Sequence, residues 1–82
     1  MKTYEIEIPI LDCRGLSCPE PLTLLRNKVR SLPAGAKIIL LSDDPVSLRD
    51  VPAYCNFMGH KLISIPDEKN PCRFIVEKKS QS

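Results

Sequence analysis

Two prolines stand where an amphipathic helix begins, and they constrain the fold of this chain more than any other feature. Pro19 and Pro21 directly precede apolar residues that recur at spacings of three, four and three, namely Leu22, Leu25, Val29 and Leu32. Proline fits the first turn of a helix because the amide hydrogen that it lacks has no intrahelical partner there. The sequence therefore predicts an amphipathic helix that starts just after Cys18.

Cys18 immediately precedes this predicted helix. A proline pushes the residue before it into an extended conformation, which is the backbone of an N-cap, so we expect Cys18 to cap the helix. The free amides of Glu20 and Leu22 and the helix dipole favour a thiolate there, and Arg14 adds positive charge. Glu20 brings an opposing negative charge. The pattern predicts an exposed, acidic thiol that acts as a nucleophile or carries sulfur.

A structural role for Cys18 is the alternative, since free cysteines are commonly small apolar residues packed at the junction of a strand and a helix. The thiol-activating role is assigned to four neighbouring residues: Arg14, Pro19, Glu20 and Pro21.

Length and composition predict a small single domain. The chain has 82 residues, no Trp and only two Phe, so its core must be aliphatic and near the lower limit for independent stability. We expect one domain over residues 1–82, with 79–82 as a disordered tail. The net charge of +2 is too small to indicate nucleic-acid binding. No apolar run resembles an export signal or a membrane span, so we expect a cytoplasmic protein.

Four cysteines raise the question of metal sites and disulfides. Their spacing lacks the close C-x-x-C pair of zinc sites, so no metal is expected, and a reducing compartment disfavours structural disulfides. Cys55 is expected in the core and Cys72 at the start of the last strand. For Cys13 we expect packing at a strand end, with a second possibility that it is the resolving thiol for Cys18.

The rest of the chain alternates between strand and helix patterns. Strands are predicted from the alternating apolar residues of 4–10, where Pro9 indicates a sheet edge, and from the segments 37–41, 62–65 and 73–78. The apolar run 37–41 suits a strand that is buried on both faces or flanked by strong neighbours. A polar connection at 66–71 joins the last two strands.

A second helix is predicted to begin at 42–45, where acidic caps precede a proline at the first helical position. Its apolar face is formed by Leu48, Val51, Cys55 and Met58. Pro52 is expected to kink or divide this helix, and Gly59 to end it. The order strand, helix, strand, helix, strand, strand predicts an α/β sandwich whose first two strands are parallel through a right-handed crossover.

Several of these segments resemble the TusA (SirA-like) sulfur-carrier family. The matching runs are Leu11-Asp12, Gly15-Leu16, Cys18-Pro19-Glu20-Pro21, Ser42-Asp43-Asp44-Pro45, Arg49-Asp50-Val51-Pro52 and Phe57-Met58-Gly59-His60. The Cys-Pro-x-Pro element is short, but its place before the first helix and the second matching block make the resemblance specific. It covers nearly the whole chain, from residue 10 to residue 79.

The resemblance implies a two-layer sandwich with a four-stranded mixed sheet and two helices on one side. It also implies that Cys18 accepts a sulfane sulfur as a persulfide and passes it to an acceptor protein, without a metal or an organic cofactor. The donor in such proteins is a cysteine desulfurase or a rhodanese-type enzyme. The sulfur serves 2-thiouridine formation in tRNA, molybdenum-cofactor maturation or sulfur oxidation.

Two arginines on the first helix are candidates for partner docking. Arg26 and Arg30 lie one turn apart and can steer acidic surfaces of a sulfur donor or acceptor, although such charges are usually just a solvated helix face. Asp43, Asp44 and Arg49 are expected to cap and fix the second helix, and they can also line a pocket. His60 is expected to be structural or solvated, because the sequence shows no partner that would orient it for catalysis.

One departure and one alternative function remain. Ser17 stands where many tRNA-thiolation members of the family have arginine, which bears on donor preference or thiol activation. The alternative is a thiol-disulfide redox switch that uses Cys13 and Cys18. A nucleic-acid-binding module is disfavoured because the sequence has no aromatic stacking surface and no basic stripe.

Overall fold

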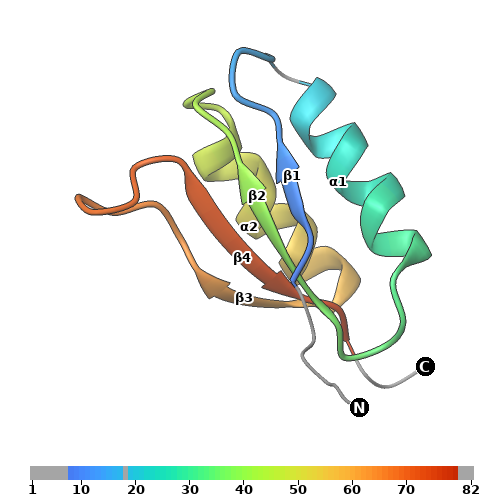
Figure 1. Ribbon diagram of the computed structural model, residues 1–82. Helices are drawn as coiled ribbons and strands as arrows, with labels where there is room; N and C mark the ends of the chain where they lie inside the picture. The colour runs from blue at the N-terminus through green and yellow to red at the C-terminus, as the bar shows by residue number, and fades with distance from the viewer. Residues whose placement is uncertain (1–7, 18, 80–82) are drawn as a thin grey trace.

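A computed structural model describes residues 8–17 and 19–79 of the chain. In chain order the elements are β1 (Ile10–Asp12), α1 (Glu20–Ser31), β2 (Lys37–Leu41), α2 (Ser47–Met58), β3 (Lys61–Ser64) and β4 (Arg73–Glu77) (Figure 1). The order of strands and helices predicted from the sequence is therefore confirmed. Residues 1–7, Cys18 and 80–82 lie outside the described residues, so the predictions for Tyr4, Ile6 and most of the C-terminal tail fall there.

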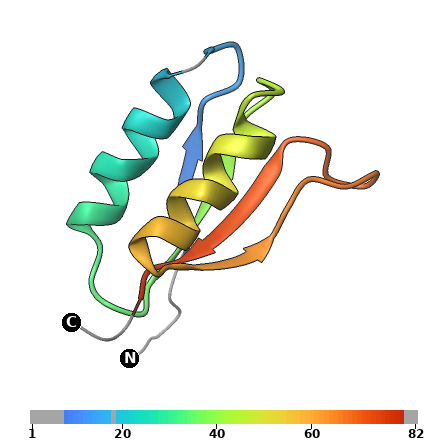
Figure 2. The ribbon, with the colours of Figure 1, turned by 180° about the vertical axis from the view of Figure 1, so that it is seen from behind.

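The strands form one mixed sheet in the order β1-β2-β4-β3. β1 and β2 are parallel, while β4 is antiparallel to both β2 and β3. Both helices cover the same face of this sheet, which Figure 2 shows from the helical side. This is the predicted two-layer sandwich. Within the described ranges, no helix is long and apolar enough to cross a membrane.

The core lies between the sheet and the two helices. Its buried apolar residues come from every layer: Cys13, Leu25, Val29, Ile38, Leu40, Val51, Cys55, Phe74 and Val76. The predicted stripe of α1 is confirmed, because Leu25 and Val29 are buried and Leu22 and Leu32 pack against this core. Burying such side chains stabilises the fold by about 1.5–3 kcal/mol each.

The first strand was predicted over 4–10, of which only 8–10 are described, and of these only Ile10 lies in β1. Ile8 and Pro9 precede β1, and the strand runs through Leu11 to Asp12. Pro9 still takes part in the ladder, since its carbonyl accepts the Ile39 amide hydrogen at 2.9 Å. A proline can accept but cannot donate a ladder hydrogen bond, which is consistent with its place next to the edge strand β1.

The second helix also differs from its prediction. α2 begins at Ser47, not within 42–45, and it has no side-chain N-cap. Val51 and Cys55 are buried as expected, but Leu48 is 55% and Met58 is 41% exposed. These two residues lie in the first and last turns of α2, where the apolar pattern continues but the core does not. The predicted apolar face is therefore correct only at its centre.

Pro52 does not divide α2, which continues as one helix to Met58. The hydrogen bond that a proline removes is close enough to the start of the helix to leave the later turns intact. Gly59 ends the helix as predicted, in the left-handed conformation with φ 80°. The Gly59 and His60 amides both donate to the Cys55 carbonyl, which is a typical glycine-terminated helix end.

Candidate functional site

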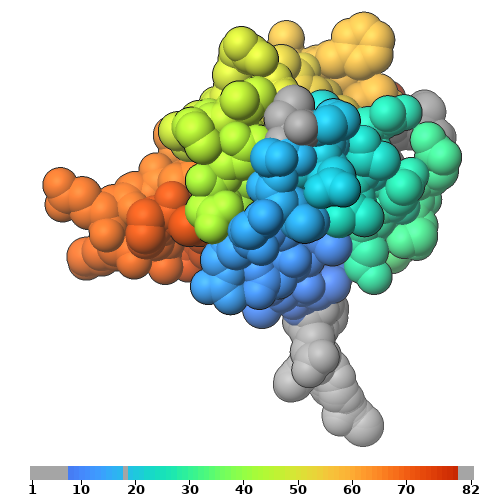
Figure 3. Space-filling model, turned by 90° about the horizontal axis from the view of Figure 1, so that it is seen from above, coloured from blue at the N-terminus to red at the C-terminus, as the bar shows by residue number. Residues whose placement is uncertain are grey.

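The segments that follow β1 and β2 lie side by side at one edge of the sheet. Because these strands are parallel, their carboxyl ends meet there. The Gly15 amide donates a hydrogen bond to Asp43 Oδ1 at 3.0 Å, which joins the two segments across 28 residues of sequence. Figure 3 looks onto this edge and shows the segment after β1 in contact with the segment after β2.

The β1–α1 segment is anchored at Cys13. The Cys13 amide donates to the Leu41 carbonyl at 2.7 Å, and the Cys13 carbonyl accepts the Leu16 amide at 3.1 Å. The turn between them needs a residue in the left-handed region, and Gly15 supplies it with φ 87°. The start of this segment is therefore fixed to the sheet, while Ser17, the last described residue before Cys18, is exposed.

Arg14 forms a two-pronged ion pair with Asp12. Its Nε donates to Asp12 Oδ1 at 2.9 Å, its second guanidinium nitrogen donates to Oδ2 at 2.8 Å, and its backbone amide donates to Oδ1 at 3.1 Å. The side-chain hydrogen bond from Arg14 is the main reason why the pKa of Asp12 falls to about 2. The positive charge predicted to act on the thiol is thus paired within its own segment.

The start of α1 departs from the predicted capping arrangement. Pro19, not Cys18, is the N-cap residue, and no side chain caps the helix. The Glu20 amide donates to the Ser17 carbonyl at 3.0 Å, so it is not a free donor for the sulfur as the sequence suggested. Glu20 and Pro21 do occupy the first turn as predicted. Cys18 itself lies outside the described residues, between Ser17 and Pro19, which are both exposed.

The other three cysteines occupy different environments. Cys13 and Cys55 are buried in the core, as predicted. Burial raises the pKa of both thiols, to about 11 for Cys55, and the Asp12 carboxylate adds to the effect at Cys13. Cys72 is half-buried and directly precedes β4, one residue before the strand begins. A raised thiol pKa disfavours the thiolate, which makes Cys13 a poor resolving partner in a redox switch.

The acidic residues of the β2–α2 segment act mainly on the loops. Asp43 accepts the Gly15 amide, whereas the sequence suggested a helix cap. Asp44 Oδ1 accepts the Val46 amide at 3.2 Å, which shapes the turn before α2. Both line a shallow groove that also includes Cys72. Arg49 pairs with Asp50 at 3.3 Å. The predicted capping of α2 is therefore wrong, because no side chain caps this helix, although Asp44 orders the turn that precedes it.

The two candidate docking arginines are exposed on α1. Arg26 lies between two grooves, one of which continues along α2 to Phe57, a side chain that is 86% exposed. Arg30 lies in the last turn of α1, at the opposite end of the helix from the residues next to Cys18. Both arginines therefore line the groove between the helices, Arg26 from the middle of α1 and Arg30 from its last turn.

His60, which was predicted to be structural or solvated, has two contacts that the sequence did not indicate. Its Nδ1 accepts the Lys79 backbone amide at 3.0 Å, and its ring packs at 5.6 Å from that of Tyr54. Burial lowers the pKa of His60, and the charges of Lys78 and Lys79 lower it further. Among the described residues, no cluster of three or more His, Cys, Asp or Glu side chains could hold a metal ion.

Sequence reasoning missed two features of this edge. The Asp43–Gly15 contact joins distant segments, so no local pattern reveals it. The Asp12–Arg14 pair has a local signal, because an aspartate two residues ahead of an amide in a turn commonly accepts from that amide. The glycine at the next position would have supported that interpretation.

The chain is similar to known proteins along most of its length. The family model described as Sulfurtransferase TusA matches residues 10–78. The sulfur carrier protein TusA of Buchnera aphidicola subsp. Baizongia pistaciae is 45% identical over 69 residues, which are 84% of this chain and 87% of that protein. A crystal structure of a SirA-like protein from Desulfitobacterium hafniense has a TM-score of 0.75 at 18% identity, covering 88% of this chain and 99% of that one, and it supports the fold.

Proposed function

Because the chain belongs to the TusA sulfurtransferase family, we propose that it is a sulfur carrier that holds the transferred sulfur as a persulfide on Cys18. The observation that carries this proposal is the contrast among the thiols. Cys13 and Cys55 are buried in the core, whereas the residues on both sides of Cys18 are exposed where α1 begins. A carrier thiol must reach the thiols of two different proteins, and buried thiols cannot.

The proposed reaction is a pair of thiol exchanges. The Cys18 thiol releases its proton to solvent, and the thiolate attacks the terminal sulfur of a donor persulfide. A new S–S bond forms on Cys18, the S–S bond of the donor breaks, and the donor cysteine leaves as a thiolate. An acceptor thiolate then attacks the terminal sulfur on Cys18, and the Cys18 thiolate is released. No net oxidation occurs, so the carrier needs no resident metal or organic cofactor for these steps.

The helix start is the proposed source of thiol activation. The positive end of the α1 dipole favours a thiolate close to Pro19, Glu20 and Pro21. Arg14 contributes less to this field than its position in the sequence suggested, because Asp12 neutralises it at 2.8 Å. Thiolate character at Cys18 then depends on the helix and not on one cationic side chain.

The partners follow from this chemistry. We propose that the donor is a cysteine desulfurase or a rhodanese-type enzyme and that a downstream relay protein accepts the sulfur. The routes implied are 2-thiouridine formation in tRNA, molybdenum-cofactor maturation or sulfur metabolism, in the cytoplasm. Arg26, with Arg30 further along α1, gives a positive surface for an acidic partner, and the exposed Phe57 offers an apolar contact beside Arg26.

Intact-protein mass spectrometry tests the proposal. After incubation with a cysteine desulfurase and cysteine without reductant, we expect the wild type to gain the mass of one sulfur atom and to lose it again when reductant is added. Cys18→Ser should gain none, whereas Cys13→Ser, Cys55→Ser and Cys72→Ser should load normally. Arg26→Glu should slow the loading without changing its final extent.

Two outcomes would contradict the proposal. An equal gain in Cys18→Ser would place the sulfur on another thiol. A loss of two hydrogens under mild oxidant, which disappears in both Cys13→Ser and Cys18→Ser, would instead indicate the redox switch.

A further inference from the structure

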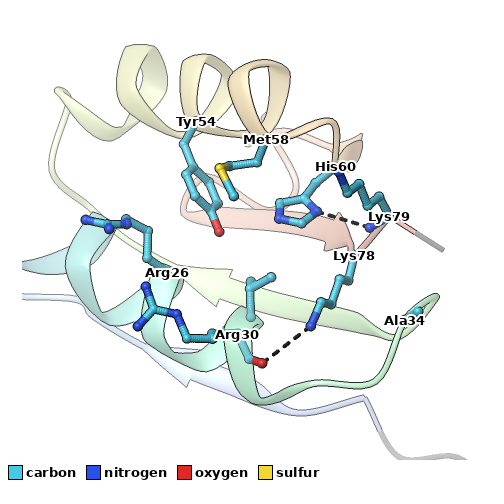
Figure 4. A pocket seen from close by; sticks show the side chains of 9 residues that line it. Arg26, Arg30, Ala34, Tyr54, Met58, His60, Lys78 and Lys79 are labelled. Carbon is cyan, nitrogen blue, oxygen red and sulfur yellow. Dashed lines mark hydrogen bonds between the residues drawn. The ribbon is translucent and has the colours of Figure 1, made fainter. Parts of the chain in front are cut away.

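A second concave site lies at the other end of the helical layer. It is a cavity of about 420 Å³ between α1, α2 and the residues that follow β4. This volume falls within the range of small-molecule sites, about 300–1,000 Å³. We call it the basic pocket, after the five side chains on its rim, which are shown with other lining residues in Figure 4: Arg26, Arg30, His60, Lys78 and Lys79.

The interior of the basic pocket is largely apolar. Val29 from α1 and Met58 from α2 line it, together with Ala34 from the turn after α1. Val29 is buried in the core, whereas Met58 is 41% exposed. A long, polarisable methionine side chain on the wall of a groove adapts readily to an apolar group that enters.

Two hydrogen-bond donors face this space, namely Tyr54 from α2 and His60, which follows the Gly59 C-cap of that helix. The Tyr54 hydroxyl points toward Arg30 across the pocket (Figure 4). The Nδ1 atom of His60 accepts the Lys79 amide, so the proton of the neutral ring is on Nε2, on the pocket side of the ring. Both donors are held in place, because the two rings pack at 5.6 Å with an angle of 53°.

Among the described residues, no salt bridge joins a cation of the rim to a carboxylate, and the nearest acidic side chain in the neighbouring groove is that of Asp50, beside Arg26. Within residues 8–17 and 19–79 the ion pairs are Arg14–Asp12 and Arg49–Asp50, and neither involves the rim. Lys78 Nζ donates to the Leu32 carbonyl at 2.6 Å and to the Arg30 carbonyl at 3.4 Å, so this charge is fixed at the end of α1. The cations act on their neighbours, since Lys78 and Lys79 lower the pKa of His60 in addition to the effect of burial.

Like charges around an apolar cavity repel one another, and a bound anion reduces that repulsion. We propose that the basic pocket binds a small organic anion with a phosphate or carboxylate head and an apolar or aromatic body. The head contacts the Arg30 guanidinium, the Tyr54 hydroxyl and His60 Nε2–H. The body packs against Val29 and Met58, and Lys79 contributes charge at the rim.

This site is separate from the proposed carrier thiol. Arg30 is in the last turn of α1, whereas Cys18 precedes the first turn. A bound anion would neutralise part of the positive surface near Arg26 and thereby weaken docking of an acidic partner. The pocket thus links a small anion to sulfur transfer without any contact with the thiol.

The single histidine of the chain makes a specific reporter. The chemical shift of a His60 ring proton is followed by NMR across pH at constant ionic strength. Phenyl phosphate is the probe, and inorganic phosphate and benzyl alcohol are the control ligands. We expect saturable binding of phenyl phosphate and a higher pKa of His60 in the complex, because the anion stabilises the imidazolium form. Phenyl phosphate should bind at least about tenfold more tightly than either control ligand, since only phenyl phosphate has both the anionic head and the aromatic body.

Variants separate a built site from general charge attraction. Arg30→Gln should weaken phenyl phosphate binding by about tenfold, the loss expected for one charge-assisted contact. Lys69→Gln, which removes an equal charge from the exposed β3–β4 loop, should leave the affinity unchanged. The thermal unfolding of both variants is measured to confirm that they fold.

Three results would overturn the proposal. The first is that inorganic phosphate binds as tightly as phenyl phosphate, and the second is that benzyl alcohol does so. The third is that Arg30→Gln and Lys69→Gln lower the affinity for phenyl phosphate equally. No sulfur donor is present, so failure here would leave the loading of Cys18 untouched, and failure of sulfur loading would leave the pocket untouched.

Discussion

The charged side chains at the two ends of the helical layer differ in whether they have partners within the chain. At the end that carries Cys18, the acidic groups have partners within the loops, because Asp12 binds Arg14 and Asp43 binds the Gly15 amide. At the other end, among the described residues, the cations of the basic pocket have no carboxylate partner. The charges of the first end therefore fix a loop. At the second end Lys78 is held by backbone carbonyls, whereas the guanidinium groups of Arg26 and Arg30 remain available to a ligand.

Both ends nevertheless depend on a glycine in the left-handed region. Gly15 has φ 87° in the β1–α1 segment, and Gly59 has φ 80° at the end of α2 beside the basic pocket. An added Cβ would meet no atom within 4 Å at Gly15 and only Lys79 Cδ at 3.5 Å at Gly59. An alanine at either position is therefore opposed mainly by its own backbone conformation.

The largest expected effect on stability comes from replacing each of these glycines with alanine. Gly15→Ala and Gly59→Ala should each lower the free energy of unfolding by about 1–2 kcal/mol, the strain of a left-handed L-residue. Only Gly15→Ala should also slow the sulfur loading of Cys18, and only Gly59→Ala should weaken phenyl phosphate binding. Urea unfolding, mass spectrometry and the His60 titration measure the three quantities.

The difference between the two ends would be contradicted if Gly15→Ala weakened phenyl phosphate binding or if Gly59→Ala slowed sulfur loading. If both variants slowed sulfur loading equally, loss of stability alone would account for it, and the two ends would not be independent.

The next effect concerns the hydrogen bond that joins the two loops. Asp43→Ala removes the acceptor of the Gly15 amide, and because this bond is exposed, water replaces it at a loss of about 1 kcal/mol. Sulfur loading should slow by no more than about fivefold, the factor that corresponds to that energy. Asp43→Asn keeps an acceptor oxygen and should restore most of the rate.

Stopped loading reactions analysed by mass spectrometry give these rates. A wild-type rate in Asp43→Ala would show that the contact between the loops does not order the carrier segment.

The architecture could be predicted because its signals are local or periodic. The stripe through Leu25 and Val29, the proline-rich helix start and the glycine at position 59 each report on their own neighbourhood, and the structure confirms all three. The error at α2 has the same origin. Ser42 to Pro45 has the composition of a helix start, but Asp43 instead accepts an amide from the other loop, and the helix begins at Ser47.

The sites were less predictable because they combine distant segments. Arg14 was expected to act on the thiol, yet its charge is paired with Asp12 two residues earlier. The basic pocket joins α1 to Tyr54, His60 and Lys79, and nothing in the periodicity of any one segment indicates that they converge. Spatial neighbours decide what a charged side chain does, and a sequence pattern supplies only the neighbours along the chain.

The smallest expected effect isolates Arg14 itself. Arg14→Gln removes the partner that lowers the pKa of Asp12, so this pKa should rise from about 2 toward its ordinary 3.8. Because the folded-state pKa of Asp12 is depressed, the ion pair contributes stability above pH 3.8, and this contribution is lost as the pH falls toward 2. NMR of the Asp12 carboxyl carbon follows the titration, and Arg49→Gln is the matched control, which should leave it unchanged.

The same variant decides how the thiol is activated. The Arg14 side chain is 55% exposed, so solvent screens the ion pair, and Arg14→Gln should lower the stability at neutral pH only slightly. Because Arg14 is already paired with Asp12, the rate of sulfur loading should stay unchanged. A marked fall in the loading rate with normal folding would mean that Arg14 acts on Cys18 in spite of Asp12. The difference between the two ends would then be smaller, because a cation at the thiol end would also serve the chemistry and not only the loop.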